Sequence, residues 1–169
     1  EDVRKEDFTA VLLSTAKENA GTFACSDARL NRLYQNVRWS QYSNMMSVPT
    51  DCPSREKGGY TGDLLIYAKT ALIVSPYMKL YENLMKDASA RYGEDTISGV
   101  AGWSDAIVWI PYEMYQVTGD RLVLKENYEA MEKWCEYIIH TAEKHSTLAI
   151  PEQYDRYLWN TGFHFGEWL

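Results

Sequence analysis

Apolar residues recur along most of this chain at the spacing of α-helices. The first such segment follows a polar stretch, with Ser26 placed as its N-cap, and we expect the helix to run to about Met46. Its apolar side keeps the i, i+3, i+4, i+7 spacing of one helical face, through Leu30, Leu33, Tyr34 and Val37. Before this helix, residues 8–13 are β-prone at their centre, which indicates a short strand or an extended lead-in.

Four further helices are predicted, and they are of two kinds. The segments 64–74 and 106–117 are apolar nearly all round, and helices of that composition are usually buried on most sides. The segments 76–92 and 127–142 are amphipathic, with apolar residues repeating at helical spacing. Apolar helices therefore alternate with amphipathic ones along the chain.

Caps and breakers suggest where these helices begin and end. Ser104 is placed to cap the second apolar helix, Pro111 implies a kink within it, and Gly119 is a plausible stop. Asn127 is placed to cap the last long helix, after a single turn over residues 121–125. From residue 146 onward the chain is polar and aromatic without a period, which predicts a loop.

The alternation of buried and half-buried helices favours an all-α fold of two concentric layers, as in an α/α toroid. A simple bundle would instead pair helices of similar amphipathicity. In a toroid of helical hairpins the connecting loops collect at one end of the helices, where a site can form. The expected fold class is therefore all-α, with a short extended lead-in at the N-terminus.

Charge and cysteine content exclude several classes of function. The chain has 17 Lys and Arg against 24 Asp and Glu, a net charge of -7, whereas nucleic-acid binding depends on clustered cations. No apolar run approaches the roughly 18 residues that span a bilayer, so neither nucleic acid nor membrane is an expected partner. The three cysteines form no CxxC pair, which argues against a disulfide scaffold and a structural zinc site. His140 and His145 fit no metal-binding motif, so we expect no metal and no cofactor.

Aromatic residues are abundant, at 14% of the chain. Composition alone favours packing in the core, although a sugar-binding cleft also needs flat aromatic faces. Position separates the tryptophans: three lie within predicted helices and are interpreted as core residues, namely Trp39, Trp109 and Trp134. Trp103 and Trp168 lie in predicted loops beside glycines, where a functional role is as well supported as a structural one.

The most conspicuous feature is the charged loop 47–63 between the first two helices. Its 17 residues include two prolines and three glycines, which exclude a regular helix and supply turns. Its ionisable groups are Asp51, Arg55, Glu56, Lys57 and Asp63. They could be surface ion pairs, with Asp63 capping the next helix, but loops on rigid scaffolds are also where chemistry is concentrated.

This loop resembles the signature of glycoside hydrolase family 78, the bacterial and fungal α-L-rhamnosidases; it reads SVPTDCPSREKGGYTGD. Flanking segments agree in the same order along essentially the whole chain: GTFACS, LNRLY, NVRWSQ, GWSDA, GD and the closing GEWL. The resemblance implies a partial (α/α)6 toroid, or barrel, of helical hairpins. Residues 1–21 would be a lead-in from a preceding domain, and 22–169 the first part of the catalytic barrel, truncated at its C-terminus. The implied partner is a rhamnose-containing glycoside or polysaccharide.

The resemblance also implies roles for individual residues. By match to the motif, Glu56 is the general acid, and the rhamnose pocket is lined by Asp51, Arg55 and Asp63. Tyr60 stands where the family usually has Trp, so a smaller aromatic wall is kept. The second loop would contribute Trp103 and Asp105, and the closing segment Trp168. Glu167 departs from the family, which has Asp there. We expect the side chains of Asp51, Glu56, Asp63 and Trp103 to converge in one concavity.

The chemistry of glycoside hydrolysis asks for such groups independently. A carboxylic acid must protonate the leaving oxygen, and inversion needs a second carboxylate, roughly 6.5–9.5 Å away, to activate water. The acid needs a raised pKa, from partial burial against aromatics and from nearby carboxylates. The resemblance puts the base beyond Leu169; local alternatives without a motif are Glu94, Asp95, Asp105, Glu152, Asp155 and Glu167.

The leading hypothesis is therefore an inverting glycosidase that hydrolyses terminal α-L-rhamnosyl linkages, with this chain carrying the acid. Two alternatives stay open on the residues alone. One is a carbohydrate-binding α/α module without catalysis, and the other is a toroid glycosidase for another deoxysugar or a uronide. The presence of Glu56 argues against lost catalysis.

Overall fold

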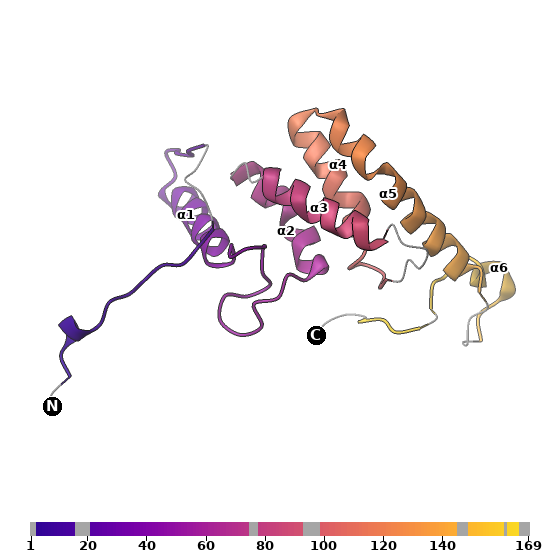
Figure 1. The fold of residues 1–169 in the computed structure, drawn as a ribbon, viewed down its shortest axis with the longest axis horizontal. Helices are drawn as coiled ribbons and strands as arrows, with labels where there is room; N and C mark the ends of the chain where they lie inside the picture. Colours follow the sequence, from indigo (N-terminus) through magenta and orange to yellow (C-terminus); the bar gives the residue numbers. More distant parts are fainter. Residues whose placement is uncertain are drawn as a thin grey trace.

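The computed structural model describes residues 3–15, 21–74, 78–92, 99–144, 149–160 and 162–165. Within these ranges the chain forms helices and loops and no strand; a lone antiparallel bridge joins Met45 and Pro49. The helices are α1 (Ala28–Ser43), α2 (Thr61–Val74), α3 (Met78–Tyr92), α4 (Ala106–Thr118), α5 (Arg121–Ala142) and α6 (Glu152–Asp155), preceded by a 3-10 turn, η1 (Lys5–Asp7). The expected all-α fold is confirmed (Figure 1).

The long helices form two layers, as the alternation of apolar and amphipathic segments predicts. The apolar helices α2 and α4 pack against each other, and α3 packs against both α4 and α5. Their shared core contains Ala68 and Ala71 of α2, Ile110 and Met114 of α4, and Tyr81 of α3, all fully buried. The described loop residues before α2, before α4 and after α5 lie along the same, lower edge of the molecule in Figure 1.

The apolar layer is buried on one side only. Ile66 of α2 is 84% exposed and Ile73 is 69% exposed, and Trp109 of α4 is 50% exposed. The prediction that these helices are buried on most sides is therefore wrong for the part of the chain that the structure describes. The reason is that α3 and α5 cover the α2–α4 layer from one side, and its other face has no described helix against it.

Helix α1 also differs from its prediction. It begins one residue later, because the carboxylate of Asp27 rather than Ser26 caps it by accepting a hydrogen bond from the Arg29 N–H at 2.8 Å. It ends at Ser43, where the chain turns towards the bridge at Pro49. Its predicted apolar face is only partly buried: Leu30 and Leu33 are exposed, whereas Tyr34 and Val37 are half-buried. Helix α1 makes few contacts with the other helices, so this face stays partly open.

Helix α5 is longer than the sequence suggested. It begins at Arg121, capped by Asp120, whose carboxylate accepts a hydrogen bond from the Leu122 N–H at 2.8 Å. The predicted cap, Asn127, is a buried interior residue whose amide donates to the Val123 carbonyl at 2.7 Å. Asp120 directly follows the stop of α4, so no separate turn intervenes.

That stop is confirmed at Gly119, which adopts φ 71° while its N–H donates to the Tyr115 carbonyl at 2.7 Å. Ser104 is not the cap of α4: the residue at the cap position is Asp105, and the Ser104 hydroxyl accepts from the Val100 N–H. Pro111 lies buried inside α4. None of the described helices is both long and apolar enough to cross a bilayer.

The N-terminal residues 8–15 form an extended lead-in rather than a strand, and they run away from the helices in Figure 1. Hydrogen bonds from Ser14 and Thr15 fasten its end to the last turn of α1 and the residues that follow it. The Ser14 hydroxyl donates to the Tyr42 carbonyl at 2.8 Å, and the Thr15 N–H donates to the Met45 carbonyl at the same distance.

Candidate active site

The charged loop between α1 and α2 is closed on itself by backbone hydrogen bonds. The Asp51 N–H donates to the Gly58 carbonyl at 3.0 Å, and the Gly58 N–H donates back to the Asp51 carboxylate at 2.8 Å. Between them lies a turn over residues 53–56, followed by Lys57 at φ 55°. A side chain at Gly58 would strike the Tyr60 ring, since a Cβ there would lie 2.7 Å from it. The loop is thus a specified structure and not a random coil.

Asp51 is the most strongly held carboxylate of this loop. It is half-buried, and burial, the largest single influence, favours its neutral form. Hydrogen bonds from the Cys52 thiol, the Gly58 N–H and nearby backbone together outweigh burial and lower the pKa of Asp51 below its ordinary value of 3.8. The site therefore contains a carboxylate that stays ionised under mildly acidic conditions.

Three carboxylates influence the hydroxyl of Tyr60. The hydroxyl donates a hydrogen bond to Glu56, and this bond, followed by the negative charge of Glu56, is the main reason why the pKa of Tyr60 is raised. Partial burial and the charges of Asp51 and Asp63 raise it further. All three acids therefore lie near enough to Tyr60 for their charges to affect its pKa.

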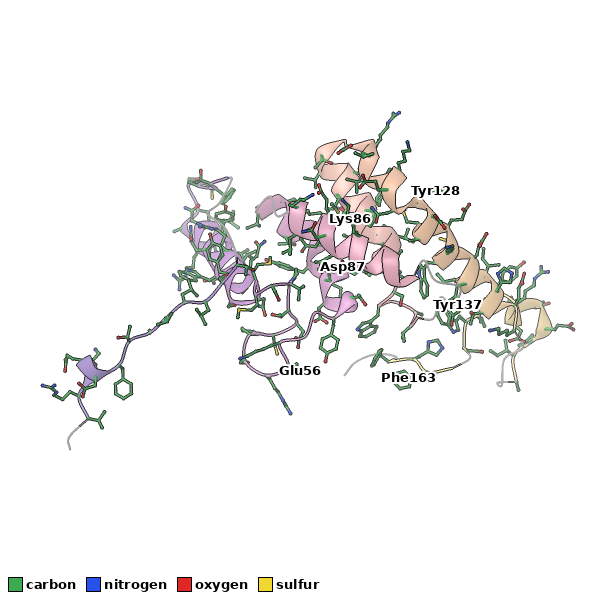
Figure 2. All side chains as sticks on the ribbon, viewed as in Figure 1. Glu56, Lys86, Asp87, Tyr128, Tyr137 and Phe163 are labelled. Atoms are coloured by element: carbon green, nitrogen blue, oxygen red, sulfur yellow. The ribbon has the colours of Figure 1, made fainter. Side chains whose placement is uncertain are left out.

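Glu56 itself projects from the turn and is exposed; Figure 2 shows it at the lower edge of the molecule. Its backbone N–H donates to the Cys52 sulfur at 3.3 Å, so the thiol contacts both Asp51 and Glu56. Arg55 is also exposed, and among the described residues its guanidinium forms no ion pair. The loop thus presents the predicted acid to solvent beside an acidic cluster.

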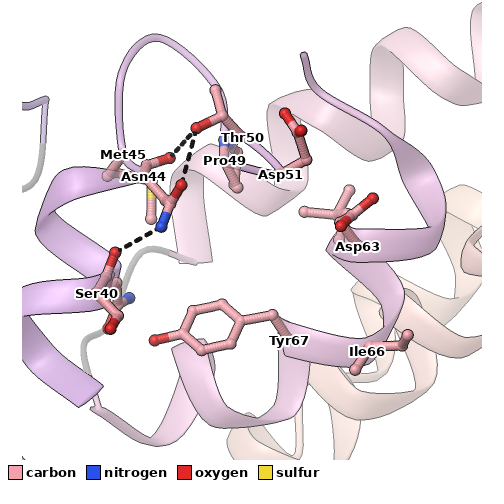
Figure 3. A pocket seen from close by; sticks show the side chains of 11 residues that line it. Ser40, Asn44, Met45, Pro49, Thr50, Asp51, Asp63, Ile66 and Tyr67 are labelled. Atoms are coloured by element: carbon pink, nitrogen blue, oxygen red, sulfur yellow. Dashed lines mark hydrogen bonds between the residues drawn. The ribbon is translucent and has the colours of Figure 1, made fainter. Parts of the chain in front are cut away.

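A cavity of about 280 Å³ lies between the end of α1, the loop and the start of α2. Asp51 and Asp63 line one side of it, and the ring of Tyr67 lies on the other (Figure 3). The remaining lining residues are Ser40, Gln41, Asn44, Met45, Pro49, Thr50, Leu64 and Ile66. The structure therefore brings Asp51 and Asp63 into one concavity, whereas Glu56 and Trp103 do not line it.

The second loop, residues 99–105, meets the first at Trp103. Its indole lies against Gly62, the residue before Asp63, so closely that a Cβ on Gly62 would be 2.7 Å from the Trp103 Nε1. The other side of Trp103 contacts Phe165, with ring centroids 4.5 Å apart. Asp105, the other predicted residue of this loop, accepts a hydrogen bond on Oδ1 from the Trp134 indole at 2.9 Å.

Several sequence-based expectations lie outside the described residues, among them Trp168, Glu94, Asp95 and Glu167. Glu152 and Asp155 belong to α6 and line a separate acidic cavity with Glu143. The interpretation of the helical tryptophans as core residues is confirmed for Trp134, which is 1% exposed, and is wrong for Trp39 and Trp109.

Sequence reasoning missed three contributors to this region. Cys52 was given no role at the site, although its place beside Asp51 was visible in the sequence. Gly62 leaves room for the Trp103 indole, because it has no side chain. Its position next to the predicted pocket residue Asp63 could have indicated a role at the site. The contact of Phe165 with Trp103 had no signal in the sequence, because it joins segments 62 residues apart.

Named proteins and solved structures are similar to this chain. The chain is 34% identical over 151 residues to an α-L-rhamnosidase of Streptomyces avermitilis, covering 82% of this chain and 14% of that protein. It is 34% identical over 137 residues to an α-L-rhamnosidase of Formosa agariphila, covering 73% of this chain and 15% of the relative. The chain thus spans about one seventh of the length of these relatives.

Solved structures agree. The α-L-rhamnosidase of Dictyoglumus thermophilum superposes with a TM-score of 0.66 at 29% identity, over 85% of this chain and 19% of that one. The Streptomyces avermitilis enzyme, complexed with L-rhamnose, gives 0.58 at 35% identity, over 72% of this chain and 13% of the other. The family described as the bacterial alpha-L-rhamnosidase 6 hairpin glycosidase domain matches residues 18–169. With its two layers of helices forming part of an (α/α)6 toroid, the chain belongs to this family.

Proposed function

We propose that this chain is the acid-bearing first part of an α-L-rhamnosidase catalytic domain. Residues 1–21 would be its lead-in, and residues 22–169 the beginning of the barrel. The family match and the named relatives support this activity, and the chain's small share of those relatives supports its being one part of a longer catalytic unit. The substrate class is a glycoside or polysaccharide with a terminal α-L-rhamnosyl group.

The proposed reaction is an inverting hydrolysis. The carboxylic acid of Glu56 gives its proton to the glycosidic oxygen as the bond from that oxygen to the anomeric carbon breaks, and the bonding electrons leave with the oxygen. A water molecule attacks the anomeric carbon from the opposite face, and a second carboxylate takes its proton. That base would lie beyond Leu169, in a later part of the barrel.

The observation that carries this proposal is that Asp51 and Asp63 line one cavity, next to a loop whose Glu56 accepts a hydrogen bond from the Tyr60 hydroxyl. Two carboxylates that share a cavity are suited to accept hydrogen bonds from sugar hydroxyls, which are the usual polar groups of a pyranose. Tyr60 and Trp103 offer aromatic faces near them, and Arg55 and Asp105 would add polar contacts. Trp168 is proposed as a further aromatic wall on the strength of the family motif alone.

The test is the variant Glu56→Gln in the full-length protein, because the amide keeps the shape of the side chain but cannot supply the proton. Hydrolysis of rhamnosides with poor leaving groups should slow by about 10²- to 10⁴-fold, the usual scale of general acid catalysis. An activated aryl rhamnoside, whose leaving group needs little protonation, should lose far less. L-Rhamnose affinity, measured by calorimetry, should be nearly unchanged.

Glu132→Gln is the matched control, since this exposed glutamate lies on α5 away from the loop. An equal loss on both substrates would contradict the role of Glu56 as the acid. Absence of turnover by the unmodified full-length protein, with sugar binding retained, would favour the non-catalytic module. Preferential hydrolysis of glycosides of another deoxysugar or of a uronide would favour the hypothesis of a toroid glycosidase with a different sugar specificity.

A further inference from the structure

We propose that Trp134, a buried residue of α5, is a positioning residue that fixes the two segments meeting at Trp103, next to the sugar pocket, and that it does so through Asp105. The inference rests on the proposed function, because the pocket it refers to is the proposed rhamnose site. Trp134 is 1% exposed and cannot itself reach a sugar. Its influence would pass through the groups that touch its ring and its N–H.

The first of these groups is the loop 99–105. The Trp134 Nε1–H donates to Asp105 Oδ1 at 2.9 Å, at the C-terminal end of this loop. At the other end, a Cβ on Gly99 would lie 2.6 Å from Trp134 Cζ3 and would also strike the Ser104 hydroxyl. The indole thus supports both ends of the loop that carries Trp103.

The second group is the segment of residues 159–160 and 162–165, which lie beneath the helices in Figure 1. Trp159 contacts Trp134 with ring centroids 5.8 Å apart, and it contacts His164 at 5.5 Å. Tyr137, one turn further along α5 (Figure 2), stacks on Trp134 at 5.5 Å and meets the edge of Trp159 at 5.6 Å. These contacts anchor the segment to the same indole that anchors the loop.

The two supported segments then meet each other at the pocket side. Phe165 contacts Trp103 at 4.5 Å, and Trp103 lies against Gly62, which precedes Asp63. A continuous series of contacts therefore leads from Trp134, through the loop and through the segment, to a residue that lines the cavity. Loss of the Trp134 N–H would release Asp105 and let Trp103 shift relative to Asp63.

A tryptophan suits this position because it combines a large ring with a single donor. Phenylalanine would keep the stacking partners of Trp134 but leave the Asp105 carboxylate without its donor. A hydrogen bond to an ionised acceptor is stronger than a neutral one, and its loss leaves a half-buried charge to find another partner. The variant Trp134→Phe therefore separates the packing role of the residue from its positioning role.

In the full-length protein, Trp134→Phe should raise the KM for an aryl α-L-rhamnoside and the Kd for L-rhamnose by about 10- to 100-fold, the scale of a misplaced binding group. The kcat should stay within about threefold, since Glu56 is on the other loop and keeps its contacts. Trp109→Phe is the matched control: this tryptophan is half-exposed on α4, its ring lies 6.1 Å from Tyr112, and we expect no change.

Asp105 supplies the second arm of the test. Asp105→Asn keeps an oxygen that can accept from the indole and should remain near the parent KM. Asp105→Ala should match Trp134→Phe, and the double variant should be no worse than either single one, because both remove the same bond. The Asp105 variants also test the positioning role if Trp134→Phe fails to fold, because Asp105 lies in a loop and its substitution disturbs the core less.

Two results would overturn the inference. One is an unchanged KM and Kd in Trp134→Phe, even with a lowered melting temperature, which would leave Trp134 a structural residue only. The other is full additivity of Trp134→Phe and Asp105→Ala, which would mean that Trp134 and Asp105 act independently and not through their shared hydrogen bond. Either result could occur while Glu56→Gln still shows its leaving-group dependence. In that case the positioning role of Trp134 would fail and the proposed function would stand. If instead Glu56 is not the acid, the positioning role can still be tested, because it is measured by L-rhamnose binding.

Discussion

Cys52 shows how one small side chain can organise two acids. Its thiol donates to the Asp51 carboxylate, and its sulfur accepts from the Glu56 N–H at 3.3 Å. The lowered pKa of Asp51 therefore depends partly on a neighbour that has no charge of its own. In the proposed site, an ionised Asp51 accepts hydrogen bonds from the sugar, so the thiol bears on the pH range of binding.

The variant Cys52→Ala removes this donor, and the pKa of Asp51 should rise towards its ordinary value of 3.8. L-Rhamnose affinity of the full-length protein should be constant above that value and should fall as the pH drops through the lowered pKa of Asp51. In Cys52→Ala the fall should begin at a higher pH, and in Cys52→Ser, which keeps a donor, it should begin closer to that of the parent.

Calorimetric titrations between about pH 3 and pH 6 measure this shift. The control is Cys135→Ala, because this free thiol is exposed on α5 away from the loop. Superimposable affinity curves for Cys52→Ala and the parent protein would contradict the role assigned to the thiol.

Gly62 is the second residue whose size matters. Its Cβ in an alanine variant would lie 2.7–2.9 Å from three atoms of the Trp103 indole, a rigid ring. Alanine would favour the helix by up to about 1 kcal/mol, but overpacking typically costs 1–3 kcal/mol, so Gly62→Ala should destabilise by roughly 1–2 kcal/mol. Denaturant unfolding measures this, and the fluorescence of Trp103 should change. Gly21→Ala should change neither the stability nor the fluorescence, because no atom lies within 4 Å of the added Cβ.

At the scale of helices, periodicity predicted the number and kind of the main helices but not their exposure. The apolar character of α2 and α4 was identified correctly, and Ala68 and Ile110 are fully buried. Leu33 follows the same spacing in α1 and is exposed, because burial depends on a partner helix that local spacing cannot reveal. Within the site, Asp51 and Asp63 could be grouped from one short motif, whereas Trp134 and Phe165 could not, since their contacts are non-local.

The start of α5 gives a test at this scale. Asp120→Ala removes the acceptor for the Leu122 N–H and should cost about 1 kcal/mol, as is usual for the loss of an N-cap. Hydrogen exchange of the Leu122 amide should become faster in this variant. Asn127→Ala should leave that exchange unchanged, since Asn127 lies inside the helix and bonds to the Val123 carbonyl. Rapid exchange throughout residues 121–125 of the unmodified protein would contradict the observed start at Arg121.

At the scale of the whole molecule, the described helices form one sector of a toroid. The face of the α2–α4 layer that is turned away from α3 and α5 carries Ile66 and Ile73, both largely exposed. Exposed apolar faces of this kind are typical of surfaces that another element covers. The same sector brings the two loops of the proposed site together at Gly62 and Trp103.

The isolated chain of residues 1–169 should therefore differ from the full-length protein in two ways. Its open apolar layer should bind a hydrophobic dye and promote self-association, both measurable by fluorescence and light scattering. It should show essentially no turnover of either poor or activated rhamnosides, because we propose that the carboxylate that activates water lies beyond Leu169 and inversion needs both carboxylates. Robust turnover by the isolated chain would mean that the base lies within this sequence, and Glu152 and Asp155 of α6 would then be the first described residues to test.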